Sequence, residues 1–122
     1  MADITYTASL NVDKDFLYNS VQASGITATM AIAGMSSSTL TLGTAATSVV
    51  TANLTTVGLA FLRNVSTSTL SSAVIGVSAG GSNVGFCSLR AGEPAIVRLT
   101  SGTQYSAWGV AGTRLRIDIT EG

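Results

Sequence analysis

The stretch LRAGEPAIVRL, residues 89–99, reads as the end of one β-strand, a tight turn and the start of the next strand. Gly92 can adopt a positive φ and Pro94 cannot donate to a strand ladder, so we expect the turn around these two residues. After the turn, every second side chain from Ala95 to Leu99 is apolar and would line one face of a strand. The stretch therefore predicts two strands joined as a hairpin.

The same alternation of apolar and polar side chains recurs along the chain. Residues 4–12 and residues 114–119 alternate without an error, which is typical of half-buried strands. Shorter strands are expected at residues 16–21, 26–33, 39–43, 47–54, 59–65, 73–77, 84–89, 95–100 and 105–108. Gly and Ser clusters between them mark turns, among them Ser24-Gly25 and Gly80-Gly81. About ten short strands at this spacing predict an all-β fold, a sandwich, jelly roll or barrel.

Length and composition favour one domain. A chain of 122 residues suffices for one core, so we expect a single antiparallel β-sandwich, jelly-roll-like, over residues 1–122. Only 10% of the residues are charged, and none between Phe16 and Leu62. Typical globular proteins carry about 25%. We interpret the uncharged surface as buried against other subunits, although a sandwich solvated by Ser and Thr hydroxyls would share this composition.

Charge and hydropathy exclude several partners. The net charge is zero and no basic cluster exceeds the alternating pair Arg114 and Arg116, so no nucleic acid is expected as a partner. No apolar run approaches the roughly 20 residues that span a bilayer, so no membrane is expected either. The first residues, Met1-Ala2-Asp3, do not resemble a signal peptide. The single Cys87 fits synthesis in a reducing cytoplasm and is expected to pack as a small apolar side chain.

Residues 76–80, GVSAG, match the G-x-S-x-G pattern of a hydrolase nucleophile elbow. The elbow needs a histidine to accept the proton of the serine, here Ser78, and this chain contains none. Gly80-Gly81 also predicts a hairpin turn instead of the start of a helix. We therefore expect no catalytic residue and no enzyme.

Metal and cofactor sites are not expected. Zinc and copper lack ligands because the chain has no histidine and one cysteine. Asp13 and Asp15 could share a calcium ion with Asn11, but the sequence after them lacks the Gly and the closing Glu of a calcium loop. A solvated turn is the better interpretation. Lys14 is the only lysine, so no phosphate-binding loop is present.

Acidic and aromatic side chains leave one further possibility, a carbohydrate site. The six acids are too scattered for a glycosidase pair, and Glu93 beside Arg90 reads as a local ion pair or an interface contact. The seven aromatic residues, Trp108 among them, mostly alternate with polar neighbours as core residues do. A core role is therefore favoured over a carbohydrate groove.

Four segments carry a family resemblance: LTTVGLAFLRN at 54–64, VIGV at 74–77, FCSLRAGEPA at 86–95 and LRIDI at 115–119. Together they resemble a recurrent β-rich module in structural proteins of tailed bacteriophages. The resemblance spans residues 54–120, and residues 104–112 depart from it, because the family favours an aromatic, an alanine and a charged residue there.

The resemblance implies a virion component that is made in the host cytoplasm and assembled in many copies. We expect a capsid decoration (cement) protein, a homotrimer seated between major capsid proteins. The candidate interface residues are Arg63, Arg90, Glu93 and Arg98, since charges this scarce are expected at contacts; the alternative is that they are solvated rim residues. A tail or baseplate module and a carbohydrate-binding adsorption module remain alternatives.

Overall fold

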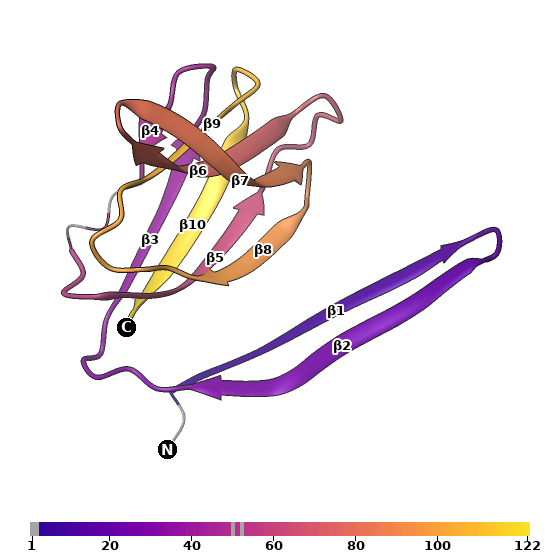
Figure 1. Cartoon of the computed structure of the whole chain (residues 1–122), viewed down its shortest axis with the longest axis horizontal. Helices are drawn as coiled ribbons and strands as arrows, with labels where there is room; N and C mark the ends of the chain where they lie inside the picture. Colours follow the sequence, from indigo (N-terminus) through magenta and orange to yellow (C-terminus); the bar gives the residue numbers. More distant parts are fainter. Residues whose placement is uncertain (1–2, 50, 52) are drawn as a thin grey trace. The chain divides into compact units, whose positions relative to one another are not determined.

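The computed structural model describes residues 3–49, 51 and 53–122, which form ten strands and no helix. All strand pairs are antiparallel, which confirms the predicted all-β class. The chain divides into two compact units, which comprise Met1–Ala31 and Ile32–Gly122. Figure 1 labels the strands of both units.

The first unit is a two-stranded ribbon, here called the arm, made of β1 (Ile4–Lys14) and β2 (Leu17–Ala28) (Figure 1). β1 confirms the strand predicted at residues 4–12. The separate strand predicted at residues 26–33 is wrong, because β2 continues through the expected turn at Gly25 and ends at Ala28. Gly25 has a φ of 67° at a bulge, where the register of the ribbon shifts. A bulge tolerates the same glycine conformation that a turn requires.

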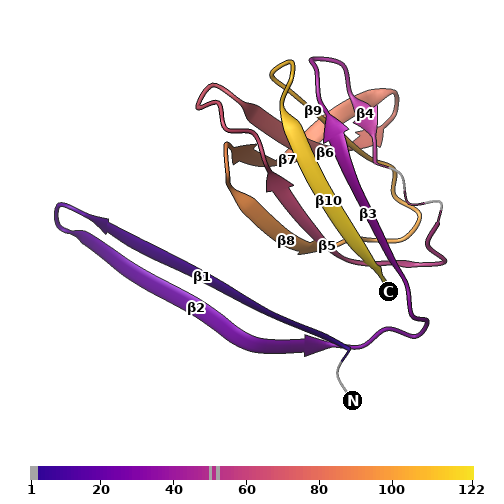
Figure 2. The ribbon, with the colours of Figure 1, turned by 180° about the vertical axis from the view of Figure 1, so that it is seen from behind.

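The second unit contains two four-stranded sheets, with strand orders β3-β10-β5-β8 and β4-β9-β6-β7 (Figure 2). The strands are β3 (Met35–Thr41), β4 (Thr47–Ser48), β5 (Val57–Asn64), β6 (Ser72–Ala79), β7 (Ser82–Arg90), β8 (Pro94–Arg98), β9 (Tyr105–Gly109) and β10 (Arg114–Glu121). The strand predicted at residues 47–54 is shortened to β4, and residues 50 and 52 lie outside the described part.

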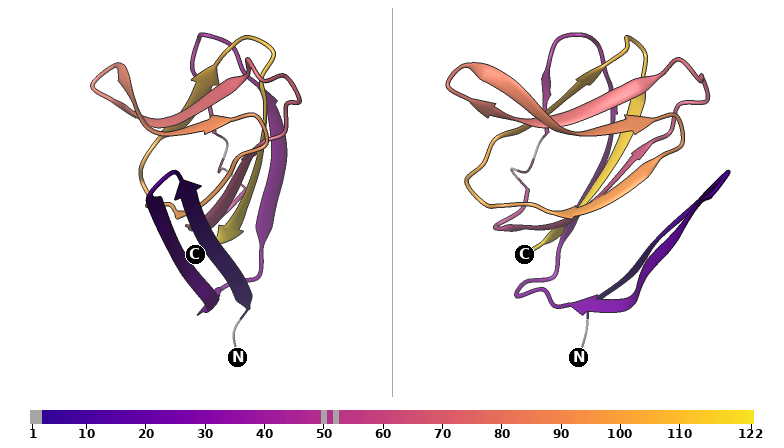
Figure 3. Two further views of the ribbon diagram at one scale, coloured as in Figure 1. Left: turned by 90° about the vertical axis from the view of Figure 1, so that its right-hand side faces the viewer. Right: turned by 45° about the vertical axis from the view of Figure 1, so that its right-hand side comes forward.

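The two sheets pack face to face around one apolar core, which confirms the predicted antiparallel sandwich (Figure 3). Leu115, Ile117 and Ile119 on β10 are almost fully buried and alternate with polar residues, as the sequence predicts. The opposite sheet contributes core residues from β6, β7 and β9, namely Ala73, Ile75, Leu89, Tyr105 and Ala107.

The connection between β7 and β8 corrects the predicted hairpin at residues 89–99. The two strands do not pair: β7 pairs with β6 in one sheet, and β8 pairs with β5 in the other. The turn lies where expected, because the Glu93 N–H donates to the Arg90 carbonyl at 3.0 Å and Gly92 has a φ of 82°. It is therefore a corner that carries the chain from one sheet to the other.

A buried carboxylate fixes the loop before β5. Glu121 accepts hydrogen bonds from the backbone N–H groups of Thr55 at 2.9 Å and Thr56 at 3.0 Å. These two bonds, that from Thr56 foremost, hold the pKa of Glu121 below its ordinary value. Ionised Glu121 therefore ties the end of the last strand to the start of β5.

Acidification is expected to weaken the fold through Glu121. Its folded-state pKa is lowered, so its contribution is complete above the ordinary pKa of about 4.3 and is lost as the pH falls through the lowered value. The Glu121→Gln variant should be less stable than the parent chain at pH 7, and the difference should shrink on acidification. Urea unfolding from pH 7 to pH 2.5 measures it; a constant difference would contradict this role.

Candidate functional site

The outer face of the β3-β10-β5-β8 sheet gathers most of the basic side chains of the second unit. Its side chains alternate with the core residues of the same strands. The basic and apolar members of this face are Arg63 and Phe61 on β5, Arg98 and Ile96 on β8, Arg114 and Arg116 on β10, and Met35 on β3. We call this surface the arginine face.

Two of the four predicted interface residues, Arg63 and Arg98, lie on the arginine face. Arg63 is opposite Pro94, and its Nε donates to the Gly92 carbonyl at 3.3 Å. Arg98 is opposite Leu59 at the other end of β8 and is exposed. Phe61 and Ile96 form a cross-strand pair between the two arginines, and the Phe61 side chain is 37% exposed. The face thus combines an apolar centre with cationic ends.

The other two predicted residues, Arg90 and Glu93, lie at the corner between the sheets. The Glu93 carboxylate accepts a hydrogen bond from the Arg90 backbone N–H at 2.6 Å. Arg90 and Glu93 are therefore joined by two hydrogen bonds: the Arg90 N–H donates to the Glu93 carboxylate, and the Glu93 N–H donates to the Arg90 carbonyl. Together they close the turn. The expected ion pair between the two side chains is absent from the described residues, where the carboxylate serves the backbone instead.

Sequence reasoning missed Asn64, which is fully buried beside the corner. Its Nδ2 donates to the Leu89 carbonyl at 3.2 Å and to Ser71 Oγ at 3.4 Å, and its Oδ1 accepts from the Ser66 N–H at 3.1 Å. The backbone N–H of Asn64 donates to the Glu93 carbonyl, and the Asn64 carbonyl accepts from the Gly92 N–H. One side chain therefore links the end of β5, the following loop and β7. An asparagine normally signals a turn, so its type alone does not reveal this role.

The sequence shows the alternating pair Arg114 and Arg116, but sequence reasoning missed that strand pairing places Arg63 beside it. Arg116 pairs in register with Arg63, and like charges in that position repel. Asp118 compensates in part, because its Oδ2 accepts from Arg116 Nε at 2.9 Å. Asp118 is only 5% exposed, and its Oδ1 has no hydrogen-bond partner among the residues that the structure describes. The face keeps an excess of positive charge and suits an acidic or hydroxyl-bearing partner.

The serine of the G-x-S-x-G pattern lies on a strand. Ser78 is on β6, and its Oγ donates to Asn83 Oδ1 at 2.7 Å across the β6-β7 hairpin. Gly80 and Gly81 both have positive φ, which confirms the predicted hairpin turn. On β7, Cys87 is half-buried; burial, and secondly the charge of Glu93, raise the pKa of its thiol.

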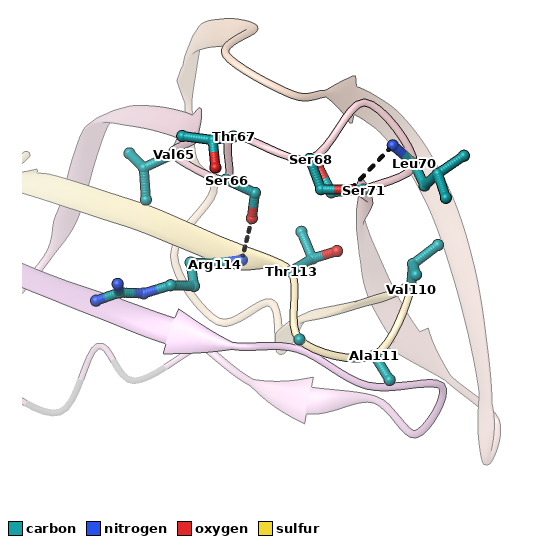
Figure 4. A pocket seen from close by; sticks show the side chains of 11 residues that line it. Val65, Ser66, Thr67, Ser68, Leu70, Ser71, Val110, Ala111, Thr113 and Arg114 are labelled. Carbon is teal, nitrogen blue, oxygen red and sulfur yellow. Dashed lines mark hydrogen bonds between the residues drawn. The ribbon is translucent and has the colours of Figure 1, made fainter.

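A pocket of about 330 Å³ opens at one end of the sandwich (Figure 4). Its walls are the loop after β5 and the turn before β10, and the lining includes Ser66, Ser68, Leu70, Val110 and Thr113. The lining is aliphatic and rich in hydroxyl groups. Thr113 is buried, and within the described part of the chain its Oγ1 has no hydrogen-bond partner. The pocket suits a small neutral group or an ordered water.

A second hollow surrounds Trp108 on the outer face of the other sheet. Its lining includes Thr44, Ser82, Asn83 and Trp108, and its volume is about 400 Å³. The indole lies close to Gly76, where a Cβ would stand 2.6 Å from Cη2. The predicted core role of Trp108 is therefore wrong in detail: the ring is half-buried and covers glycines on an outer face.

Three comparisons complete the description of the site. No family model, no curated protein and no solved structure matches this chain. Within the described residues, no cluster of three or more His, Cys, Asp or Glu side chains could hold a metal ion. The same part of the chain has no helix that is long and apolar enough to span a membrane. The resemblance to phage structural proteins stays a prediction.

Gly92 offers a test of the corner. A Cβ at this position would meet no atom within 4 Å, so the cost of Gly92→Ala is only the strain of its positive φ. We expect a loss of about 1 kcal/mol in the free energy of unfolding. Gly43→Ala is the matched control, because it also has open space but no positive φ, and should be neutral or slightly stabilising. Urea denaturation measures both; equal effects would contradict the interpretation.

Proposed function

We propose that this chain is a structural protein of a bacteriophage virion, a capsid decoration protein that bridges major capsid proteins. The observation that carries the proposal is the arginine face, where an apolar centre at Phe61 and Ile96 lies between Arg63 and Arg98. A small face of this kind binds modestly by itself. Repeated over many copies on a particle, modest contacts add to a strong stabilisation.

The strand order of the second unit supports the proposal at the level of the fold. Its eight strands form two four-stranded sheets, β3-β10-β5-β8 and β4-β9-β6-β7, between which the chain crosses repeatedly. We infer a jelly roll, an architecture of eight strands in two sheets that viral capsid and lectin domains use. This support is an analogy of fold, and the site must carry the function.

Rebinding to particles tests the proposal. Purified chain should rebind heads from which it has been stripped and raise the temperature at which they break. Arg63→Glu and Arg98→Glu should each weaken binding at least about tenfold, because each reverses a contact charge. The double variant Thr69→Asp/Thr103→Glu, which alters two exposed positions outside the arginine face, should bind normally. Labelling confined to tails would refute decoration and favour a tail or baseplate module.

The hollow around Trp108 favours one second candidate, a carbohydrate-binding adsorption module. Aromatic faces beside amide and hydroxyl groups suit sugar rings, and Asn83 and Ser82 lie next to this indole. A glycan panel tests it, and Trp108→Phe with Asn83→Ala should reduce binding while the fold is kept. Absence of binding across the panel would remove this candidate. The homotrimer stays a prediction, which a measurement of the molecular mass of the purified protein in solution tests.

A further inference from the structure

The arm is amphipathic across its whole length. In the observed register, the side chains of even-numbered β1 residues share one face with their partners on β2. This apolar face holds Ile4, Tyr6, Ala8, Leu10, Val12, Leu17, Val21, Ala23, Ile26 and Ala28, with Lys14 and Asn19 near the tip. The opposite face is polar and includes Ser9 and Gln22, which pair with each other.

A two-stranded ribbon cannot bury such a face by itself. Leu10 is 59% exposed, Val21 50% and Leu17 62%. Isolated two-stranded hairpins are marginally stable in water and need a further layer that covers their apolar side. The face therefore has the composition of one half of a sandwich.

The apolar face is not flat, because small and large side chain pairs follow one another along it. The small pair Ala8 and Ala23 leaves a shallow groove of about 320 Å³, and the larger pair Leu10 and Val21 stands next to it as a ridge. The distance between the two pairs along the strands is one side-chain repeat, about 7 Å. Groove and ridge are therefore neighbours on the same surface.

We propose that the apolar face of the arm binds the same face of a second copy of this chain, with the two arms antiparallel. A twofold axis between Ala8 and Leu10 places each groove opposite the ridge of the other copy. Leu10 and Val21 then fill the space above Ala8 and Ala23, in both directions. A parallel arrangement would place groove over groove and leave a void, which costs stability.

Charge favours the antiparallel register as well. It brings Lys14, the only charged side chain of the apolar face, opposite Ile4 of the other copy, at the end of the arm where Asp3 supplies a negative charge and accepts the Met30 N–H at 2.9 Å. The parallel arrangement would bring the two Lys14 side chains together at the same end of the interface. The antiparallel register also places Tyr6 above the Val12–Asn19 pair, where its hydroxyl meets an amide instead of apolar side chains. Shape and charge thus select one arrangement.

The area sets the expected strength. A ribbon of ten residue pairs is roughly 35 Å long and 10 Å wide, so two faces bury roughly 1,000 Å² of accessible surface. This is the low end of specific interfaces, and we expect a dissociation constant on the order of 10–100 µM. Such a contact is weak for an isolated pair and effective between copies held on one particle.

This inference rests on the proposed function in one respect: arm pairing would be one of the contacts between copies on the particle. It can be tested with the purified chain alone. Sedimentation of the full chain from about 1 µM to 1 mM should show reversible association. Leu10→Lys or Val21→Lys should raise the dissociation constant at least about tenfold, since each would bury an unpaired charge. Ser9→Lys and Gln22→Lys add the same charge to the polar face and should leave association unchanged. The near-ultraviolet signal of Trp108 verifies that the second unit stays folded.

Spin labels test the register. In a Cys87→Ser background, labels at Ser9→Cys lie near the axis on the outer faces of the two packed layers, so that only the thickness of these layers separates them. Labels at Asp13→Cys should be farther apart, because each Asp13 lies four residues from the axis, on opposite sides of it. Eight residues of about 3.4 Å add roughly 27 Å along the strands to the separation across the layers. Equal distances at both positions would refute the antiparallel register, and no distance between copies at 1 mM would refute pairing.

The two proposals fail separately. A chain whose arms do not associate at 1 mM but which rebinds stripped heads overturns arm pairing and keeps decoration. A chain whose arms pair as described but which binds no particle overturns decoration and keeps arm pairing. Equal effects of Leu10→Lys and Ser9→Lys overturn arm pairing whatever the particle does.

Discussion

The Gly76→Ala variant is expected to lose about 3 kcal/mol of unfolding free energy, because there is no room for a Cβ. The added carbon would press against the backbone carbonyl of Val84 and stand 2.6 Å from Cη2 of Trp108. The carbonyl belongs to the neighbouring strand β7 and cannot swing aside like the end of a flexible side chain. Relief would require β6 and β7 to separate at the bulge that follows Ile75.

Chemical denaturation of Gly76→Ala beside Gly43→Ala isolates the steric cost, since a Cβ at Gly43 meets nothing within 4 Å. Trp108→Phe in the Gly76→Ala background should recover only part of the loss, because the smaller ring frees one contact and leaves the carbonyl of Val84 in place. A loss below about 1 kcal/mol would show that the strands yield easily and would contradict this account of the glycine.

Asn64→Ala should cost about 3 kcal/mol for a different reason. The substitution removes the donor to the buried Leu89 carbonyl and the acceptor of the Ser66 N–H, and each group left without a partner costs about 1–3 kcal/mol. The loss should also be local at first. The amide of Gly92, which donates to the Asn64 carbonyl, should exchange its hydrogen faster as the corner loosens.

The exposed Asn53 provides the control for this prediction, and Asn53→Ala should change stability by less than about 0.5 kcal/mol. Asn64→Asp separates the two halves of the effect: it keeps an acceptor for Ser66 but offers no amide donor to Leu89. If Asn64→Ala and Asn53→Ala prove equally mild, the buried network does not hold the corner.

The strands with the clearest alternation could be predicted from sequence because their signal is local. Residues 4–12 and 114–119 needed only a period of two, and both lie in observed strands. The corner at Gly92 shows where this reasoning ends. The same turn residues serve a hairpin or a change of sheet, and only the partner of β8, which is β5 in place of β7, separates the two. That pairing joins segments distant in sequence.

The candidate site was predictable to the same extent. Scarce charges predicted Arg63 and Arg98, but their place on one face with Arg116 follows from strand register, which the sequence pattern does not give. Glu93 was expected to form a local ion pair with Arg90 or an interface contact; within the chain, its carboxylate accepts the backbone N–H of Arg90 at 2.6 Å. Asn64 was missed because its burial depends on three segments that meet only in the folded chain.

The position of β10 has a consequence for how the protein is made. This strand lies between β3 and β5 and supplies Leu115, Ile117 and Ile119 to the core. Before β10 is made, β3 has no partner within its sheet and β5 pairs only with β8, so the sandwich closes only once β10 is available. We therefore expect folding to be slow, as distant strand pairing dictates, and the open sheet edges to need protection from aggregation until β10 pairs.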